Sequence, residues 1–239
     1  MKVLRTRKVF AGLTAVLCLT AVGLLAISSS VSAEEGRPRR APIDPEQAKK
    51  IWAVQATCAA GAAGIKGEDA EKVVKAYLAA QEAYAKKVAD LPRTRESSQQ
   101  RRELGEKAAA DLKEALTKAV GAEKAGKVIG LLSPFGMMGS RVNRMIGGLI
   151  EFKLPKEKLG KAVIAVMENN KEQAKLFAEA RESGSFEGVR EKMQPLTEAL
   201  NKKLSAILSE EQMATWKEKY ARPFGGRRGP GAGGRRRPE

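Results

Sequence analysis

The sequence predicts an all-α protein built from amphipathic helices. Apolar residues recur every three to four positions along most of residues 43–221, which is the spacing of one face of an α-helix. No segment alternates as a half-buried strand would, and no hairpin-turn signal is present. We therefore expect elongated helical hairpins or a bundle. Three stripes carry this prediction: Val73, Val74, Tyr77, Leu78, Gln81, Tyr84, Ala85, Val88 and Leu91; Leu104, Ala108, Leu112, Leu116 and Val120; and Val189, Met193, Leu196, Leu200, Leu204 and Leu208.

Proline and glycine mark where these helices should be interrupted. Pro92, Pro134, Pro155 and Gly184 lie outside or at the ends of the stripes. Pro195 lies inside the third stripe, where it removes a backbone amide and clashes with the preceding turn, so we expect a kink there.

Two helix starts carry capping motifs. Asp44 precedes a proline and is followed three residues later by Gln47, and Ser209 is followed at the same spacing by Gln212. In each motif the cap oxygen can accept a backbone N–H of the first turn, and the glutamine can bond the amide of the cap residue. A cap of this kind is worth about 1 kcal/mol. Capping boxes are common, so these motifs predict helix starts and by themselves no function.

The first 33 residues have the pattern of an export signal. Residues 2–8 carry four basic side chains and no acid, residues 9–27 carry no charge, and Val31-Ser32-Ala33 has the small-x-small form of a cleavage site. We expect residues 1–33 to be a cleaved signal peptide and the protein to be periplasmic or otherwise exported. The alternative is an uncleaved membrane anchor, because the uncharged run approaches the about 20 residues that span a bilayer.

The rest of the chain divides into a linker, two helical units and a tail. The predicted parts are a linker at 34–42, helical unit 1 at 43–136, a connector at 137–149, helical unit 2 at 150–225 and a disordered basic tail at 226–239. The two units share a pattern, because the leucine stripe that leads to Pro134-Phe135-Gly136 recurs before Pro223-Phe224-Gly225. This favours two diverged repeats. The alternative is chance, since leucine at every fourth position occurs in any amphipathic helix.

The composition offers no constellation for catalysis. The chain has no histidine, which removes the commonest general base and the commonest transition-metal ligand. Only Cys58 would remain after removal of the signal, so an intrachain disulfide is excluded in the mature protein. We expect a buried structural thiol, with an intermolecular disulfide as the alternative. Trp52 and Trp216 are expected to be packing residues. We predict no enzymatic activity, no cofactor and no metal.

The segment around the second cap resembles a known family. The leucine stripe that leads into Leu208-Ser209-Glu210-Glu211-Gln212 is similar to the Leu-Thr-x-x-Gln motif of the LTxxQ-motif (Spy/CpxP-like) periplasmic proteins, with serine in place of threonine. The resemblance covers mainly residues 187–221, and Ile43-Asp44-Pro45-Glu46-Gln47 is a more distant candidate for a first copy. It implies a cradle of long helices, often a homodimer, that binds unfolded or envelope proteins without ATP.

An apolar segment between the two units is the predicted client-binding site. Residues 128–152 are rich in glycine and large apolar side chains and are interrupted by cations. Methionine adapts to varied partners, and cations attract acidic ones. The alternative is that this segment fills the junction between the units. The predicted client-binding residues are Phe135, Met137, Met138, Arg141, Arg144 and Phe152.

The C-terminal tail concentrates positive charge among glycine and proline. Its arginines are Arg227, Arg228, Arg235, Arg236 and Arg237. No aromatic residue is interleaved to stack on bases, which argues against nucleic acid, and we expect an anionic membrane or cell-wall surface as the partner. The expected function is that of an exported, ATP-independent chaperone-like or envelope-stress accessory protein. The alternative is a structural or scaffolding envelope protein whose tail binds an anionic surface.

Overall fold

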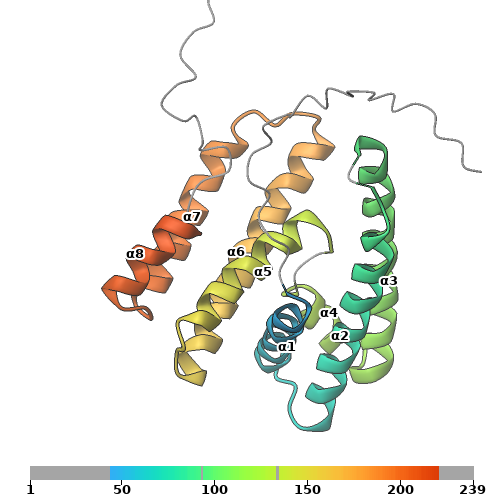
Figure 1. Ribbon diagram of the computed structural model, residues 1–239, viewed down its shortest axis with the longest axis horizontal. Helices are drawn as coiled ribbons and strands as arrows, with labels where there is room; N and C mark the ends of the chain where they lie inside the picture. The colour runs from blue at the N-terminus through green and yellow to red at the C-terminus, as the bar shows by residue number, and fades with distance from the viewer. Residues whose placement is uncertain (1–43, 93, 133–134, 221–239) are drawn as a thin grey trace, which may run out of the picture. The chain divides into compact units, whose positions relative to one another are not determined.

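The computed structural model describes residues 44–92, 94–132 and 135–220, apart from the side chains of Arg95, Met137 and Met138. All of these residues belong to the unit that spans 42–239. The described chain is helical and contains no strand, which confirms the prediction of an all-α fold (Figure 1). Its helices are α1 (Pro45–Ala62), α2 (Glu68–Ala89), α3 (Arg95–Val120), α4 (Ala122–Ile129), α5 (Met137–Glu151), α6 (Lys156–Glu182), α7 (Val189–Ser205) and α8 (Glu210–Lys219).

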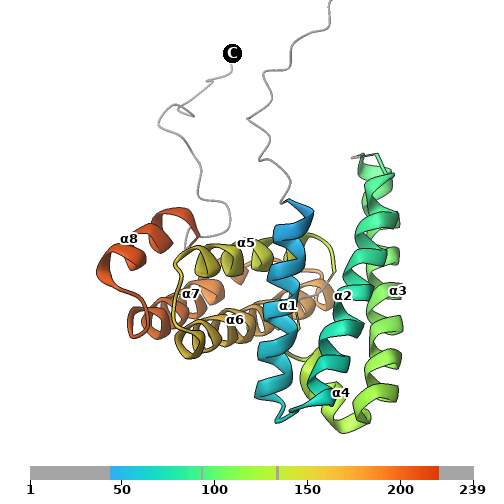
Figure 2. The ribbon, with the colours of Figure 1, turned by 60° about the horizontal axis from the view of Figure 1, so that its bottom comes forward.

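Two helical hairpins form most of the bundle. The helices α2 and α3 pack side by side, as do α6 and α7, and a short helix follows each hairpin. The helices α1 and α5 lie between the hairpins, because α1 contacts α2, α4, α5 and α6, and α5 contacts α6. In Figure 2, α5, α6 and α7 run crosswise to α1, α2 and α3. The order of elements does not test the proposed duplication, which stays a prediction.

The three apolar stripes of the sequence face the interior. Val73, Tyr77 and Gln81 are the buried residues of α2, Leu112 and Leu116 are buried on α3, and α7 buries Met193, Leu200 and Leu204. The period of 3.6 residues places such positions on one side of a helix, so their burial against neighbouring helices stabilises each hairpin. Burial of one such side chain contributes about 1.5–3 kcal/mol.

The helix α5 packs closely because it lacks side chains where its neighbours approach. A Cβ atom placed at Gly147 would lie 3.1 Å from Cδ1 of the buried Ile51. A Cβ atom at Gly148 would lie 2.5 Å from Cζ of Tyr220. The two glycines therefore let α1 and the end of α8 reach the backbone of α5.

The breaks between helices follow the punctuation of the sequence, with one exception. Pro155 is the N-cap residue of α6, and Gly184 follows the end of α6 in a left-handed conformation with a φ of 68°. Pro195 instead lies inside α7, which is helical from Val189 to Ser205 and packs against α6. The kink expected at Pro195 stays a prediction.

Candidate functional site

Ser209 and Gln212 form a complete capping box at α8. The hydroxyl of Ser209 accepts the amide N–H of Gln212 at 3.3 Å, and Oε1 of Gln212 accepts the amide N–H of Ser209 at 3.0 Å. The side-chain amide of Gln212 also donates to the carbonyl of Phe152 at 3.3 Å, which ties α8 to the end of α5. At α1, Asp44 accepts the amide N–H of Glu46 at 2.8 Å, and Gln47 is exposed. The cap of α1 is therefore formed by Asp44 without the predicted bond from Gln47, and the complete capping box occurs only at α8 of the two predicted sites.

The predicted client-binding residues do not lie together. Phe135 precedes α5 and packs on Tyr84 of α2 with ring centroids 5.2 Å apart, whereas Phe152 follows the other end of α5. The helix between them is about 22 Å long. Both phenylalanines are half-buried. The side chains of Met137 and Met138 lie outside the described residues.

The two predicted client-binding arginines differ in their surroundings. Arg141 is half-buried, and its Nη1 donates to Oε1 of Gln173 on α6 at 3.4 Å. Burial, and then the neighbouring Arg144, lower the pKa of the Arg141 guanidinium. Arg144 is exposed, and its Nε donates to the carbonyl of Ser140. Arg144 is thus the more accessible of the two for an acidic partner.

Most of the large apolar side chains of α5 face the core. Val142, Met145, Ile146 and Leu149 are each at most 6% exposed. This burial corresponds to the alternative interpretation of the segment, in which it fills the junction between hairpins. Two recesses elsewhere between the helices have more apolar than polar accessible surface.

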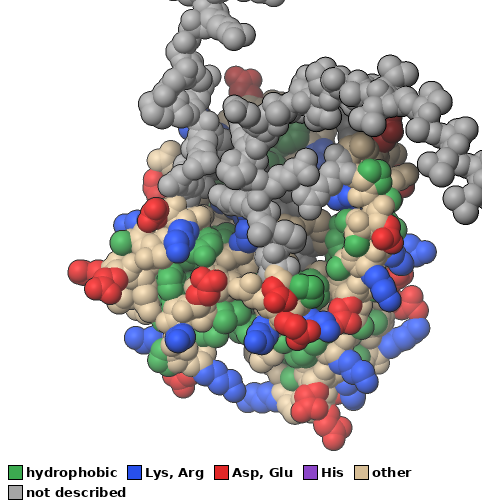
Figure 3. All heavy atoms as spheres, in the orientation of Figure 1, with side chains coloured by type: hydrophobic (Ala, Val, Ile, Leu, Met, Phe, Trp, Pro, Cys, Tyr) green, Lys and Arg blue, Asp and Glu red, His purple; other side chains and the backbone are tan. Residues whose placement is uncertain are grey.

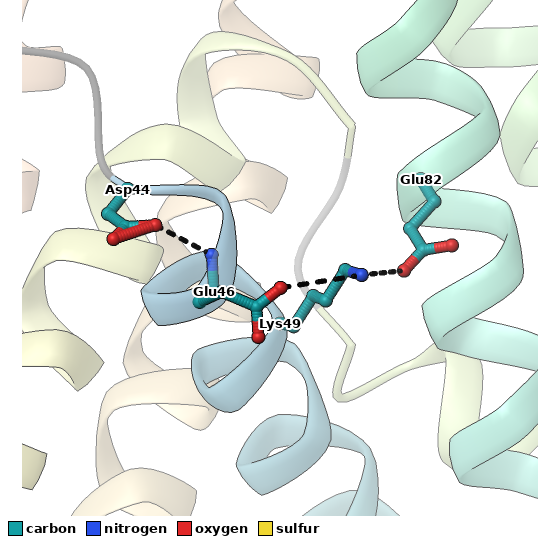
Figure 4. A network of polar contacts seen from close by, with 4 residues as sticks. All are labelled: Asp44, Glu46, Lys49 and Glu82. Carbon is teal, nitrogen blue, oxygen red and sulfur yellow. Dashed lines mark hydrogen bonds and ion pairs between the residues drawn. The ribbon is translucent and has the colours of Figure 1, made fainter.

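The larger recess, the α1–α2 groove, has a volume of about 520 Å³. Its walls are mostly apolar, and half-buried Ala70, Val74 and Leu78 form its floor. Glu82 lines this groove and forms an ion pair with Lys49 of α1, with Nζ and Oε1 3.2 Å apart. Figure 4 shows this pair beside Asp44, which caps α1. The hydrogen bond to Glu82 raises the pKa of the Lys49 ammonium. The described residues that line the α1–α2 groove are Thr57, Ala70, Glu71, Val74, Lys75, Leu78, Ala79 and Glu82.

The second recess, the α6–α7 cleft, has a volume of about 380 Å³. Lys203 of α7 reaches across it to Glu168 of α6, with Nζ and Oε2 2.8 Å apart. Both side chains are exposed, so this ion pair contributes little to stability. The cleft is also lined by three polar residues, Asn169, Lys171 and Glu172. Its apolar lining consists of Leu131, Ala165, Leu196, Ala199 and Leu200.

A third recess, the Trp52 cavity, differs from the other two because much of its lining is polar. Its volume is about 290 Å³, and it lies among α1, α2, α3 and the start of α5. The polar lining consists of Gln81, Arg101, Ser140 and Asn143 together with the backbone of Gly136 and Gly139. The remaining wall is formed by Trp52, Tyr84, Ala85, Val88, Ala89 and Leu91.

A chain of buried hydrogen bonds reaches this cavity. Gln81 donates to the hydroxyl of Tyr77 at 2.9 Å, and that hydroxyl donates to Oε1 of Gln55 at 3.1 Å. Gln55 in turn donates to Oδ1 of Asn143 at 2.6 Å, so the chain joins α2, α1 and α5. Burial raises the pKa of the Tyr77 hydroxyl, which keeps it a donor at any physiological pH. These polar groups satisfy one another.

The described residues contain neither a metal-binding cluster nor a helix that could span a bilayer. No group of three or more Cys, Asp or Glu side chains within them is arranged to hold a metal ion. None of the helices in the described part combines the length and the apolar character that a bilayer crossing requires. The predicted signal peptide, the linker, and the tail arginines Arg227, Arg228, Arg235, Arg236 and Arg237 lie outside the described residues.

Comparisons of the chain with protein-family models, with curated proteins and with solved structures found no match. The resemblance to the LTxxQ-motif proteins therefore stays a prediction.

The sequence pattern did not reveal the recesses. Val74 and Leu78 belong to the first apolar stripe, but they sit at its margin and remain half-exposed, whereas Val73 and Tyr77 take the core positions. The feature of the sequence that could have predicted the α1–α2 groove is the width of the first apolar stripe. Adjacent apolar pairs at 73–74 and 77–78 make an apolar face wider than one neighbouring helix covers.

Proposed function

We propose that this protein is an exported, ATP-independent chaperone-like protein that holds apolar segments of unfolded or envelope proteins. The α1–α2 groove is the observation that carries the proposal. It offers an open apolar floor of Ala70, Val74 and Leu78 on the surface of a helical bundle. Contiguous apolar surface of this kind is a common feature of interaction sites. The α6–α7 cleft provides a second, smaller surface in which apolar and charged residues are mixed.

The charge pattern around these recesses suits weak and reversible binding. Lys75 and Glu71 flank the α1–α2 groove, and Lys203 pairs with Glu168 over the α6–α7 cleft. On the face drawn in Figure 3, positive and negative side chains are interspersed among hydrophobic ones. Burial of one client side chain would contribute about 1.5–3 kcal/mol, so a few contacts give binding that reverses without ATP.

Aggregation of an unfolded client tests the proposal. Residues 34–239 should suppress light scattering by a chemically denatured client at near-stoichiometric ratio. Ala79→Glu places a charge in the groove at an exposed position and should weaken suppression, because the client would have to desolvate that charge. Ala83→Glu is the matched control, since Ala83 is exposed on the same helix, one turn further along and outside the groove. Equal activity of the two variants, or no suppression by the unmodified protein, would contradict the proposal.

A second candidate function is that of a scaffolding protein, which the arginine content of residues 226–239 favours. Deletion of 226–239 should then abolish sedimentation with vesicles that contain anionic lipid. A holdase should instead keep most of its suppression of aggregation after the same deletion.

A further inference from the structure

The floor of the α1–α2 groove is an apolar surface on the outside of the bundle. Val74 and Leu78 are half-buried and Ala79 is exposed, although α1 packs directly beside α2 (Figure 2). The groove follows α2, a helix of 22 residues, and has a volume of about 520 Å³. An apolar face of this kind is what a helix presents to another helix. The groove therefore offers room and apolar contacts to one more helix.

A row of four charged side chains accompanies this floor between residues 71 and 86 of α2. In chain order the row consists of Glu71, Lys75, Glu82 and Lys86. The first three line the groove, and Lys86 is exposed one turn beyond Glu82. At 3.6 residues per turn all four lie within about 80° of the direction of Leu78, so they share its face of the helix. The midpoint of the row falls between Leu78 and Ala79.

The order of these charges is self-complementary. Glu71 and Lys86 lie equally far from the midpoint of the row, on opposite sides of it. The same holds for Lys75 and Glu82. A second α2 that runs antiparallel about this midpoint therefore places every acid of the row opposite a base.

Other arrangements of two α2 helices bring like charges together. A shift of the second helix by one turn in one direction would place Glu71 opposite Glu82 of the second copy. A shift by one turn in the other direction would place Lys75 opposite Lys86 of the second copy, and a parallel copy would set each charge against itself. Because like charges repel, the row favours one orientation and one register.

The row is available for pairing across an interface. Within the part of the chain that the structure describes, Glu71, Lys75 and Lys86 take part in no ion pair. Glu82 pairs with Lys49, but its side chain is 50% exposed, so the carboxylate can accept a second cation.

We propose that α2 of a second copy of this chain occupies the α1–α2 groove, as an antiparallel pair with its twofold axis between Leu78 and Ala79. Each copy contributes the same surface to such an interface, so every contact occurs twice. Leu78 of one copy packs on Ala79 of the other. These apolar contacts supply affinity, and the charges set the orientation, because exposed ion pairs contribute little by themselves.

The pair closes the groove, so it differs from the cradle that the resemblance to the LTxxQ-motif proteins implies. A client and a second copy compete for the same apolar floor. Association depends on concentration, so dilution opens the groove to clients. This regulation of client binding rests on the proposed function, whereas the pairing of two copies does not.

Sedimentation equilibrium of residues 34–239 tests the pairing without any client. A dimer should form with a Kd on the order of 10 μM, as expected for a small interface between two helices. Lys86→Glu sets an acid against Glu71 of the second copy and should raise the Kd at least about tenfold, since each reversal acts twice. Glu71→Lys should do the same. The double variant Glu71→Lys/Lys86→Glu exchanges the two charges and should restore the Kd of the unmodified chain.

Lys87→Glu is the matched control. Lys87 is exposed in the same last turn of α2, but it points about 180° away from Leu78, so its reversal should leave the Kd unchanged. Restored association requires a folded chain, so misfolding cannot imitate the result of the double variant. A chain that stays monomeric at about 500 μM, a double variant as weak as either single one, or equal effects of Lys86→Glu and Lys87→Glu would overturn the proposal.

Suppression of aggregation tests the competition separately. At about 50 μM, above the expected Kd, Lys86→Glu should suppress aggregation at a lower ratio of chain to client than Lys87→Glu, because more of its grooves are open. Equal suppression by the two variants would refute the competition. A lack of suppression by every variant would overturn the proposed function, and sedimentation would still decide the pairing.

Discussion

The indole of Trp216 donates to Oδ1 of Asn201 at 3.1 Å, and this hydrogen bond joins α8 to α7. Trp216 is fully buried, and its ring also lies 5.3 Å from that of Tyr220. The helix α8 is only ten residues long, so its position depends on such contacts more than on its own helical stability.

Asn201→Ala should lower the free energy of unfolding by about 1–3 kcal/mol, because the buried indole N–H would lose its acceptor. Urea denaturation followed by circular dichroism measures the change. Asn201→Asp keeps an acceptor oxygen and serves as the control, so it should be less destabilising. A loss as large for Asn201→Asp as for Asn201→Ala would show that the hydrogen bond is not the cause.

Tyr77→Phe should also destabilise the protein by about 1–3 kcal/mol. The Tyr77 hydroxyl is the middle member of the chain from Gln81 to Gln55, and its loss would remove the acceptor of Nε2 of Gln81 and the donor to Oε1 of Gln55. Tyr84→Phe is the matched control, because the Tyr84 hydroxyl makes only a 3.5 Å contact and is half-buried. Thermal or urea unfolding should separate the two variants clearly, and similar stabilities would argue against a structural role for the chain.

Ser209→Ala should cost about 1 kcal/mol, because it removes the cap of α8. Ser209→Thr keeps the hydroxyl and should be nearly neutral. Gln212→Ala should cost more than a simple cap, since Gln212 also bonds the carbonyl of Phe152. Hydrogen exchange of the α8 amides would show the loss locally, and unchanged protection in Ser209→Ala would count against the capping role.

Cys58 should react slowly with thiol reagents. Burial raises the pKa of its thiol, so less of the reactive thiolate is present at pH 8 than in an unfolded chain. In residues 34–239 Cys58 is the single cysteine, and its labelling by a chromogenic disulfide should accelerate on addition of urea. The free energy of unfolding should fall as the pH rises above the ordinary thiol pKa, because the unfolded thiol ionises first. Equal labelling rates with and without urea would contradict this expectation.

The sequence predicted the fold class because helical periodicity depends on local spacing. The stripe positions Tyr77, Leu116 and Leu204 are fully buried, as their spacing requires. The capping box of α3, in which Thr94 accepts the amide N–H of Ser97, escaped prediction because serine replaces the usual glutamine or glutamate. Pro195 lies inside α7 without ending it, and the kink expected there stays a prediction.

The candidate sites were less predictable because they depend on tertiary packing. Trp52 was predicted to be a packing residue, and it is buried, but the cavity that it lines is visible only once Arg101 and the start of α5 are placed beside it. Residues 128–152 were chosen for their apolar content, and the same content buries Ile146 and Leu149 in the core. Apolar composition alone does not separate a core helix from a binding surface.

The glycines of α5 have a consequence for how the protein assembles. Gly139, Gly147 and Gly148 each disfavour a helix by about 1 kcal/mol relative to alanine, so this 15-residue segment cannot hold its own conformation in water. A synthetic peptide of residues 137–151 should give a coil spectrum by circular dichroism. The conformation of α5 therefore depends on its packing against α1 and α6, so we expect a disturbance of either contact to melt α5 before the two hairpins.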